Sequence, residues 1–470
     1  MLRIVKNALP MGTPQVPVAI IGAGACGLTT ALILSDAAVG CVLLERDAQP
    51  SGSSALSSGF IPAAGTHVQK ALGIDDSAAR FATDIQAKAH GGAAAHLVHA
   101  YSQNIAPAMD ALQDRHGLEF RVLDGFLYPG HSTYRMHCVP EKTGADLMAR
   151  LQAAAAKADV PILTQALVQE LWQDSQGRIA GIGFQRPNGA MEYLSCDVLV
   201  LACNGFGGNN AMVQELLPQM RNAIFAGHTG NDGSAIVWGK ALGARLADLG
   251  GYQGHGSWAV PQGALISWAL MMEGGFQVNA LGQRFHDETQ GYSEAAVKVL
   301  AQPGSIAWNV LDEPLLKLAR GFPDFCDAEK AGAVKPCVDV PALARVIGCD
   351  AATLNATLHA MLRETAGTLN DTAFGRNFKR QLTAPFYAVK VTGALFHTQG
   401  GLDIDADCRV LREDGSPLPN LLAAGGAARG VSGNAVWGYL SGNGLLSAVA
   451  GGYIAAQTAA QIVNSTAQAD

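Results

Sequence analysis

Short apolar runs that end in glycine turns dominate the hydrophobic pattern of this chain. Residues 16–21 are apolar and lead into Gly22, Gly24 and Gly27, and small apolar residues follow to residue 34. A second apolar run, residues 41–44, ends at Glu45. This order predicts a strand, a glycine turn, a helix and a second strand, which is the start of a parallel α/β sheet.

The spacing of the first glycines predicts a nucleotide site. In a G-x-G-x-x-G turn the first glycine permits the tight turn, the second lets the backbone approach a pyrophosphate, and the third lets the helix pack on the strand. Glu45 lies where an acid can accept both ribose hydroxyls of an adenosine, which favours FAD or NAD over NADP. A glycine turn in an unrelated α/β protein is the alternative.

Later segments repeat the pattern and favour FAD over NAD alone. A glycine-serine loop covers residues 51–66, and the apolar runs 197–208 and 417–428 both end in glycines. Residues 441–463 begin with the turn SGNG and continue as an alanine-rich helix. The N-terminal dipole of that helix would face the far end of a long cofactor.

Composition narrows the class of protein. The chain has 470 residues, enough for two or three domains, and a net charge of -7 with no basic run, which argues against nucleic acid as a partner. No apolar stretch reaches the roughly 18–20 residues of a membrane helix. The nine cysteines lack metal-ligand or iron–sulfur spacing, so we expect reduced thiols, no metal and a cytoplasmic location.

The middle of the chain differs from both ends. From 250 to 383 there are no nucleotide loops, and helical patterns cover residues 339–348 and 350–367, the second with Asp350 as its N-cap. The pattern therefore separates residues 250–383 from the flanking segments 1–249 and 384–470, which carry the nucleotide loops.

Together these motifs resemble the flavoprotein family of fumarate reductases, succinate dehydrogenases and 3-ketosteroid dehydrogenases, from about residue 18 to residue 461. GNDGSAIVWGKALGA (230–244) resembles the family's G-T-G-D-G helix start, and FHTQGGLDID (396–405) resembles its H-T-x-G-G segment. The resemblance implies a mixed α/β fold. It has a Rossmann-like FAD-binding domain of the glutathione reductase type and an inserted α+β capping domain that closes over the flavin.

The resemblance also implies the residues that contact FAD. They are Gly22, Gly24, Ala25, Cys26, Gly27, Glu45, Arg46, Ser53, Ser54, Ser58, Gly59, Val168, Ala202, Cys203, Asn204, Gly205, Asp232, Gly425, Gly426, Gly442, Asn443, Leu445 and Leu446. Two positions depart from the family. The second loop lacks the histidine that binds FAD covalently in succinate dehydrogenases, so we expect non-covalent FAD. Gly426 replaces an acid that usually contacts the flavin chain.

Two tyrosines separate the subfamilies. In GQRFHDETQGY, Tyr292 stands where fumarate reductases keep a proton-relay arginine and where 3-ketosteroid dehydrogenases keep their tyrosine base. In YLSGNG, Tyr439 stands where reductases keep their acid arginine, and Gly444 follows. The steroid enzymes hold the substrate ketone with a tyrosine and a glycine there, at a spacing one residue shorter. The resemblance is therefore closest to the 3-ketosteroid Δ1-dehydrogenases.

Other candidates have a structural alternative beside the functional one. Arg284 and Glu288 match the family's G-x-R-F-x-x-E segment and could simply pair. His397 matches the fumarate-binding histidine, and it could equally be a satisfied histidine at a strand end. Phe126, Tyr128 and Tyr134 fall in the family's pocket-lining region, although core packing explains them as well.

These residues predict desaturation of a cyclic ketone, such as a cyclohexanone derivative or a 3-ketosteroid. Tyr439 and the Gly444 N–H would stabilise the enolate, Tyr292 would take the α proton, and a hydride would pass to flavin N5. A free tyrosine has a pKa of about 10, so Tyr292 needs a neighbour that lowers its pKa.

Two other functions stay open. One is a C=C reductase of the fumarate or urocanate type, for which Arg429 is the nearby cation. The other is a flavin electron-transfer subunit without substrate chemistry of its own. The sequence does not identify the electron acceptor.

Overall fold

The computed structural model describes residues 2–125, 127–360, 363–365, 368–370, 373–378 and 380–467. The chain folds into two compact units. The first comprises Met1–Leu216, Gly227–Tyr252 and His397–Asp470, and the second comprises Leu217–Ala226 and Gln253–Phe396. The second unit extends beyond the boundary expected at residue 383, because a long strand there, β21 (Phe386–Thr398), belongs to its sheet. It also takes up residues 217–226, which the sequence assigned to the nucleotide-binding part.

A nine-stranded sheet organises the first unit, in the order β1-β8-β9-β10-β2-β3-β7, with β24 paired to β10 and β23 to β24. Strands β7, β3, β2, β10 and β24 are parallel neighbours, so their carboxyl ends share one edge. The strands are β1 Arg3–Val5, β2 Gln15–Ile21, β3 Cys41–Leu44, β7 Ile162–Leu163, β8 Leu167–Gln173, β9 Ile179–Gln185, β10 Met191–Leu201, β23 Arg409–Leu411 and β24 Pro417–Ala423.

Helices and short strands complete the first unit. The helices are α1 Ala25–Asp36, α2 Gly52–Ala55, α3 His67–Ala71, α4 Ala78–Lys88, α5 Ala95–Asp114, α6 Gly144–Lys157, α7 Asn210–Leu216, α8 Ser234–Leu242 and α15 Asn443–Ala467. The short strands are β4 Ile61–Pro62, β5 Arg121–Val122, β6 Met136–Cys138, β12 Leu246–Ala247 and β22 Gly401–Leu402. The mixed α/β fold with a parallel sheet confirms the predicted fold class.

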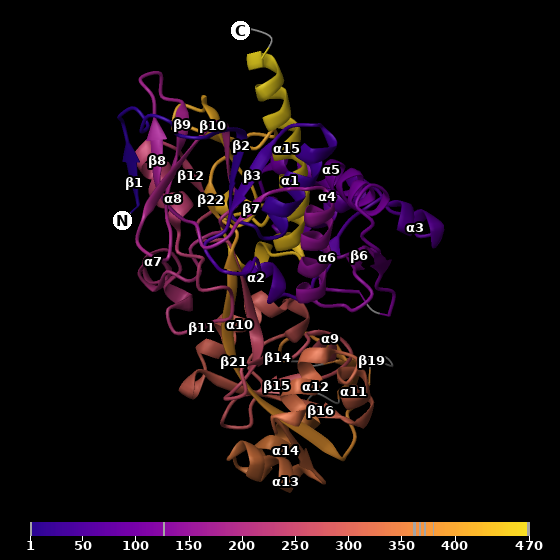
Figure 1. Ribbon diagram of the computed structural model, residues 1–470. Coiled ribbons are helices and arrows are strands. Elements are labelled where there is room, and N and C mark those ends of the chain that lie inside the picture. The colour runs from indigo at the N-terminus through magenta and orange to yellow at the C-terminus, as the bar shows by residue number, and fades with distance from the viewer. Residues whose placement is uncertain are drawn as a thin grey trace. The chain divides into compact units, whose positions relative to one another are not determined.

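Helix α15 packs along α1 although the two are far apart in sequence (Figure 1). Gly452 makes this approach possible, and Gly27 lets α1 lie against the first glycine turn. A Cβ at Gly27 would lie 1.9 Å from the Gly22 carbonyl oxygen, and one at Gly452 would lie 2.7 Å from the Cys26 carbonyl oxygen. The two helices therefore bring the first glycine turn and the start of α15 to the same region of the unit.

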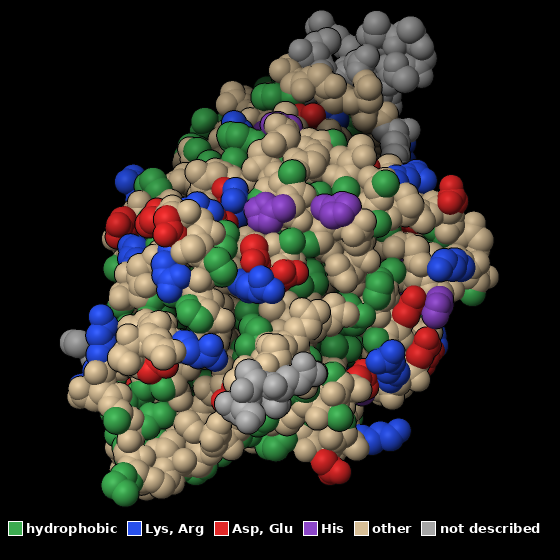
Figure 2. Space-filling model, turned by 90° about the horizontal axis from the view of Figure 1, so that it is seen from above, with side chains coloured by type: hydrophobic (Ala, Val, Ile, Leu, Met, Phe, Trp, Pro, Cys, Tyr) green, Lys and Arg blue, Asp and Glu red, His purple; other side chains and the backbone are tan. Residues whose placement is uncertain are grey.

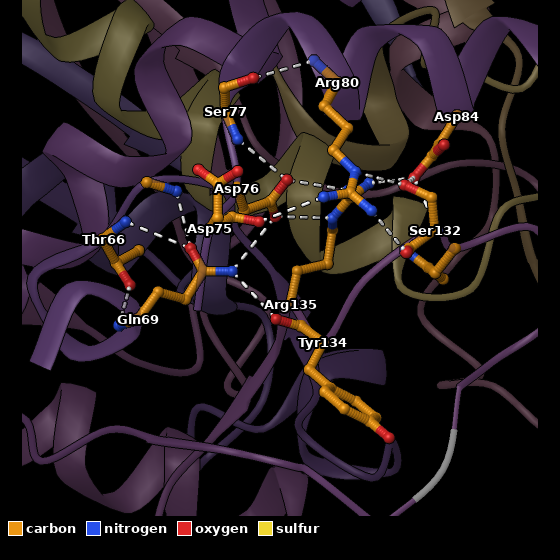
Figure 3. Close-up of polar contacts among 12 residues, drawn as sticks. Thr66, Gln69, Asp75, Asp76, Ser77, Arg80, Asp84, Ser132, Tyr134 and Arg135 are labelled. Carbon is orange, nitrogen blue, oxygen red and sulfur yellow. Dashed lines mark hydrogen bonds and ion pairs between the residues drawn. The ribbon is translucent and has the colours of Figure 1, made fainter. Parts of the chain in front are cut away.

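A buried ion cluster fixes the segment that precedes β6 (Figure 3). Arg135 donates to both oxygens of Asp76, at 2.9 and 3.0 Å, and to Asp84 Oδ2 at 2.7 Å. The side chains of Arg135 and Asp76 are fully buried. Ser132 adds its N–H and hydroxyl to Asp84 Oδ2. The cluster joins the loop before α4 and helix α4 itself to residues 132–135.

A seven-stranded sheet organises the second unit, in the order β14-β13-β21-β16-β15, with β11 and β17 paired to β21. These strands are β11 Ile224–Phe225, β13 Tyr252–Ala259, β14 Ala264–Leu265, β15 Phe276–Val278, β16 Ile306–Asp312, β17 Val334–Cys337 and β21 Phe386–Thr398. A small sheet contains β18 Arg363–Thr365, β19 Thr368–Asn370 and β20 Asn377–Phe378. The helices are α9 Ala269–Met272, α10 Tyr292–Leu300, α11 Glu313–Ala319, α12 Pro323–Lys330, α13 Val340–Ile347 and α14 Ala351–Ala360.

Both helices predicted in this unit are present, and one is shorter than predicted. Asp350 caps α14 by accepting from the Thr353 N–H at 2.8 Å. The expectation that this helix continues to residue 367 is wrong, because residues 363–365 form strand β18 and pair with β19.

The surface agrees with the charge pattern of the sequence. Figure 2 shows basic and acidic side chains interspersed over the face in view, without a large patch of one sign. Among the described residues, no helix is long and apolar enough to cross a membrane. The described ranges also hold no group of three or more acidic, histidine or cysteine side chains placed to bind a metal ion.

We predict that Arg135→Met strongly lowers the free energy of unfolding. The substitution leaves two carboxylates buried without their cation, which costs about 3–5 kcal/mol. A urea titration followed by circular dichroism measures the change. Arg121→Met is the matched control, because Arg121 pairs with Glu119 at the surface and its loss should cost only about 0–1 kcal/mol. Equal losses in the two variants would contradict the prediction.

Candidate functional site

The first glycine turn is built by backbone contacts. Gly22 has φ +104°, and a Cβ there would lie 2.5 Å from the carbonyl oxygen of Ala202, at the end of β10. Gly24 differs, because its nearest neighbour in reach of a Cβ is Ser54 Oγ at 3.8 Å. The turn is therefore closed on the side of β10 and leaves room at Gly24, where a pyrophosphate can approach the backbone.

Glu45 is fixed beside this turn. Its Oε2 accepts from the Ala23 N–H and its Oε1 from the Asp47 N–H, both at 3.0 Å, and the residue is buried. Each carboxylate oxygen keeps a further lone pair, so the pair can accept two ribose hydroxyls. The Ala166 N–H donates to the Glu45 carbonyl, which brings the start of β8, with Val168, close to Glu45.

The second loop is tied to the segment before α8. Ser53 Oγ accepts from the His228 N–H and from Asn231 Nδ2, and Ser54 Oγ accepts from the Ala25 N–H. Arg46 bonds Asp232 at 3.0 Å. Gly59 has φ +71° and no room for a Cβ beside Thr143. The loop therefore contacts the glycine turn at one end and the 228–232 segment at the other.

The departure at Gly426 has a steric explanation. A Cβ at Gly426 would lie 2.1 Å from Asn204 Oδ1, so the Asn204 side chain fills the place of the family's acid. Asn204 has φ +64° and follows β10, next to Ala202, Cys203 and Gly205. Gly425 has φ +61° and lies against Cys26, since its Cβ would be 3.2 Å from the Cys26 Cβ. Four candidate segments thus converge where the parallel strands end.

The start of α15 carries unsatisfied polar atoms. Asn443 is fully buried and Ser447 nearly so, and within the described chain neither Asn443 Oδ1 nor Ser447 Oγ has a hydrogen-bond partner. Buried polar atoms without partners are costly and rare. Together with the open backbone at Gly24 and the acceptor pair of Glu45, they fit a long cofactor with ribose hydroxyls and a polar ring. FAD is such a group.

Tyr439 and Gly444 converge despite their five-residue spacing. The Gly444 N–H lies 3.5 Å from the Tyr439 hydroxyl oxygen, because the turn between them bends at Gly442, with φ +87°. Burial raises the pKa of Tyr439 above its usual value, so its hydroxyl stays protonated. The Gly444 amide thus donates to the Tyr439 hydroxyl oxygen, and the hydroxyl keeps its own hydrogen to donate.

His397 adjoins this pair. Its ring lies 5.6 Å from the ring of Tyr439, edge-on, and a Cβ at Gly444 would be 2.5 Å from His397 Nε2. Glycine is therefore required at 444. Burial lowers the pKa of His397 to about 4, so the imidazole is neutral at neutral pH. Gln399 Nε2 lies 3.2 Å from His397 Nδ1, and Ser432 donates to Gln399 Oε1.

Arg429 is not placed as a substrate cation. It pairs with Asp248 at 2.6 Å and with Asp403 at 3.3 Å. Its charge is therefore balanced within the first unit. Gln399 and Ser432 were not predicted from sequence, although Gln399 lies inside the H-T-Q-G-G segment.

In the second unit, Tyr292 is the first residue of α10 and is buried. Its ring stacks on His255, with centroids 4.8 Å apart and planes 20° apart. His255 Nδ1 accepts from the Ser257 N–H at 3.1 Å, so its proton lies on Nε2. Burial lowers the pKa of His255 to about 3, and the ring is therefore uncharged at neutral pH. His255 was not predicted from sequence, because it stands alone in GYQGHGS without a pattern to single it out.

Glu288 is saturated by hydrogen bonds. Oε1 accepts from the Gln277 N–H and from Arg284 Nε, and Oε2 accepts from Arg284 and Arg376 at 2.6 and 2.8 Å. Burial alone would raise the pKa of Glu288, but Arg284 and Arg376 outweigh it and hold the pKa at about 2. This geometry favours the structural alternative for Glu288 and Arg284.

The predicted pocket aromatics are dispersed. Tyr128 is half-buried and its ring lies 6.3 Å from that of Phe60. Tyr134 is 36% exposed, and its side chain points away from the ion cluster in Figure 3. Phe126 lies outside the described residues.

The remaining candidates for FAD contact lie in two places. The hydrophobic core of the first unit includes or contacts Leu445, Leu446, Cys26 and Cys203, and α2 is followed by Ser58 and Gly59.

Fold and site together define a flavoprotein oxidoreductase of the α/β class. The family model of the FAD binding domain matches residues 17–445, and the chain belongs to this family. The family, the FAD cofactor and the fold predicted from sequence are confirmed. Members of the wider superfamily of fumarate reductases and succinate dehydrogenases act on C=C bonds, and so does this FAD-dependent oxidoreductase.

Individual relatives carry different activities. The chain is 27% identical to the probable fumarate reductase Ifc3 of Shewanella frigidimarina, over 97% of this chain and 77% of the relative. It is 26% identical to a 4-oxocyclohex-2-ene-1-carboxylate 5-dehydrogenase of Sinomonas cyclohexanicum, over 70% of this chain and 61% of the relative. The structure of a 3-ketosteroid-Δ4-(5α)-dehydrogenase of Rhodococcus jostii RHA1 superposes with a TM-score of 0.77 and 25% identity, over 97% of this chain and 99% of that one.

We predict that Gly24→Val folds but loses most of its FAD. A valine side chain would enter the open space at Gly24 and exclude the pyrophosphate, while the fold keeps its contacts. Flavin is measured against protein after acid precipitation, which releases non-covalent FAD into the supernatant and leaves covalent flavin in the pellet. Gly40→Val is the control, because Gly40 is exposed and a Cβ there meets Pro17 at an ordinary 3.6 Å. Wild-type flavin content in Gly24→Val would contradict this role.

Proposed function

We propose that the protein desaturates a cyclic ketone at its α,β carbon–carbon bond. The observation that carries the proposal is the hydrogen bond, 3.5 Å long, from the Gly444 N–H to the Tyr439 hydroxyl oxygen in the first unit, which holds this hydroxyl as a donor. A tyrosine hydroxyl whose oxygen accepts from a backbone N–H can donate its own hydrogen to a ketone oxygen that becomes an enolate. The high pKa of Tyr439 keeps its proton available for this hydrogen bond.

Tyr292 is the proposed base. It removes the α proton as the C–H bond electrons move toward the carbonyl. When bound, FAD accepts the β hydrogen as a hydride, so the substrate loses two electrons and two hydrogens. An unidentified electron acceptor must then reoxidise the flavin.

The position of Tyr292 at the start of α10 favours the phenolate, because a helix N-terminus stabilises nearby negative charge. His255, being neutral, orients the Tyr292 ring by stacking and contributes no positive charge. The helix N-terminus is therefore one local electrostatic feature that supports Tyr292 as a base.

The pairing of arginines speaks against a dicarboxylate substrate. A fumarate-type reductase needs cations that bind carboxylates and an arginine that donates a proton. Arg429 is balanced by Asp248 and Asp403. Arg284 and Arg376 both pair with Glu288. The two positions at which the family's reductases keep arginines are Tyr292 and Tyr439, which suit a neutral substrate.

The names of two similar proteins support a ring ketone as substrate and differ in the size of the ring system. By their names, one relative acts on an oxocyclohexene carboxylate and one structural neighbour on 3-ketosteroids. The steroid neighbour is covered over 99% of its length by 97% of this chain, so chain length gives no preference and the proposal includes both kinds of ring ketone.

A fumarate- or urocanate-type reductase is the second candidate. The 27% identity to a probable fumarate reductase over nearly the whole chain supports it, and so does the retained His397. A flavin electron-transfer subunit is the third, and it needs neither tyrosine.

Anaerobic titration of the flavin separates these functions. We expect a cyclohexanone derivative or a 3-ketosteroid to bleach the oxidised flavin of the wild type. Fumarate and urocanate should fail to reoxidise the chemically reduced enzyme. If the acids reoxidise the flavin and the ketones leave it oxidised, the protein is a fumarate- or urocanate-type reductase and not a ketone dehydrogenase. If neither class of compound reacts, the electron-transfer subunit gains support.

For Tyr292→Phe we expect full FAD content and a loss in kcat of about 10²–10⁴-fold, the usual contribution of a general base. The phenyl ring keeps the stack on His255, so the fold is preserved. Stopped-flow bleaching of the flavin measures the loss. Tyr453→Phe is the matched control, because Tyr453 lies on α15 several turns from its start. Near-wild-type bleaching in Tyr292→Phe would reduce Tyr292 to a packing residue.

For Tyr439→Phe we expect kcat/KM to fall about 10²–10³-fold, the effect of removing one donor from an oxyanion site. Because the hydrogen bond strengthens as the enolate forms, kcat should fall more than KM rises. Steady-state kinetics with the best ketone of the titration supply both constants. A change confined to KM would show that Tyr439 binds the ketone without stabilising the enolate.

A further inference from the structure

The turn that joins Tyr439 to Gly444 is held from outside by the segment Tyr128–Arg135. The ring of His131 lies 3.0 Å, through Nε2, from the carbonyl oxygen of Ser441. A carbonyl can only accept, so His131 Nε2 carries the proton and donates it. Ser441 is 2% exposed, so its carbonyl has little access to water. His131 therefore supplies the hydrogen-bond donor for the Ser441 carbonyl in the middle of the turn.

A second contact joins the same two segments. Gly130 has φ +85°, and a Cβ there would lie 2.7 Å from Leu440 Cδ1. Neighbouring residues of one segment, Gly130 and His131, thus meet neighbouring residues of the other, Leu440 and Ser441. Elsewhere in the turn, a Cβ at Gly442 would lie 2.5 Å from Pro62 Cδ. The turn is held between these two supports.

The segment that carries His131 is itself anchored. Arg135 and Ser132 bind the buried carboxylates of Asp76 and Asp84 (Figure 3). The ring of His131 also stacks on Phe81 of α4, with centroids 6.3 Å apart. His131 is consequently held in place by contacts that connect α4 to the turn.

Its protonation state suits this contact. Burial, with the nearby positive charge of Arg135, lowers the pKa of His131 to about 4, although the bond to Ser441 and the charge of Asp84 act in the opposite direction. The imidazole is therefore neutral at neutral pH, with its single proton on the nitrogen that faces Ser441.

We propose that His131 is a positioning residue for the Tyr439–Gly444 donor pair. By holding the Ser441 carbonyl, it fixes the bend that brings the Tyr439 hydroxyl and the Gly444 N–H to 3.5 Å. The role rests on the proposed function of that pair. His131 contacts neither reacting atoms nor the pair itself, and it acts through the shape of the turn.

A double-mutant cycle tests the proposal. We expect His131→Ala to keep its FAD and lower kcat/KM about 10-fold, which corresponds to one net hydrogen bond of about 1.4 kcal/mol. In the Tyr439→Phe background the same substitution should change kcat/KM far less, because the pair it positions is already broken. His131→Gln, whose amide can donate to Ser441, should recover most of the activity.

Controls separate positioning from stability. His96→Ala removes another imidazole–carbonyl contact of the first unit, that with Ile404, and should leave kcat/KM near the wild-type value. If His131→Ala does not fold, His131→Phe keeps a ring beside Phe81 and removes the donor. An equal fall in both Tyr439 backgrounds, or a fall in unfolding temperature alone with unchanged kcat/KM, would overturn the proposal.

The cycle also distinguishes this inference from the proposed function. If ketones do not bleach the flavin but an unsaturated acid reoxidises it, ketone desaturation is wrong, and the cycle is run with that acid. Coupling between His131 and Tyr439 in the acid reaction would still support positioning of the turn. Additive effects in that reaction would reject it.

Discussion

The structure of the first unit depends on backbone lying directly against backbone where the parallel strands end. Gly22 touches the carbonyl after β10, Gly27 touches the Gly22 carbonyl, and Gly452 touches the Cys26 carbonyl. Each contact excludes a side chain, so glycine at these places is a packing requirement before it is a binding feature. Gly24 is different because the space beside it is open. The turn is therefore closely packed around these glycines and open at Gly24, where a pyrophosphate can approach. Glu45 lies next to this opening, since its carboxylate accepts from the Ala23 N–H.

Charged side chains near the candidate residues are likewise paired within the protein. In each unit the arginines near the candidate residues bind carboxylates of their own unit: Arg429 with Asp248, Arg135 with Asp76, and Arg284 with Glu288. Breaking such buried pairs is costly, so these cations are held in place. The histidines His397 and His255 are kept neutral by burial. This internal pairing underlies the proposal of a carbonyl substrate rather than a carboxylate, with the Tyr439 hydroxyl as its donor.

Much of the fold and of the cofactor site could be predicted from the sequence, since G-x-G-x-x-G followed by an acidic strand end is a local pattern. Contacts between distant segments could not. His255 stacks on Tyr292 only because β13 and α10 lie in one unit. The carbonyl of Ser441 is satisfied by a histidine from the other half of the chain. The predicted helix beyond residue 360 was wrong because pairing between β18 and β19 replaced helical hydrogen bonds. Tertiary pairing outweighed local propensity there.

The spacing between Tyr439 and Gly444 illustrates what the fold adds to a motif. A motif comparison counts residues, and by that count this turn is one residue too long for the ketone site of the steroid enzymes. In three dimensions the extra residue is absorbed by a bend with positive φ at Gly442, which lies against Pro62. The bend is stable because His131 donates a hydrogen bond to the Ser441 carbonyl. Gly130, which has no side chain, leaves room for the side chain of Leu440. The geometry of the proposed donor at this turn thus depends on the supporting segment as well as on the motif.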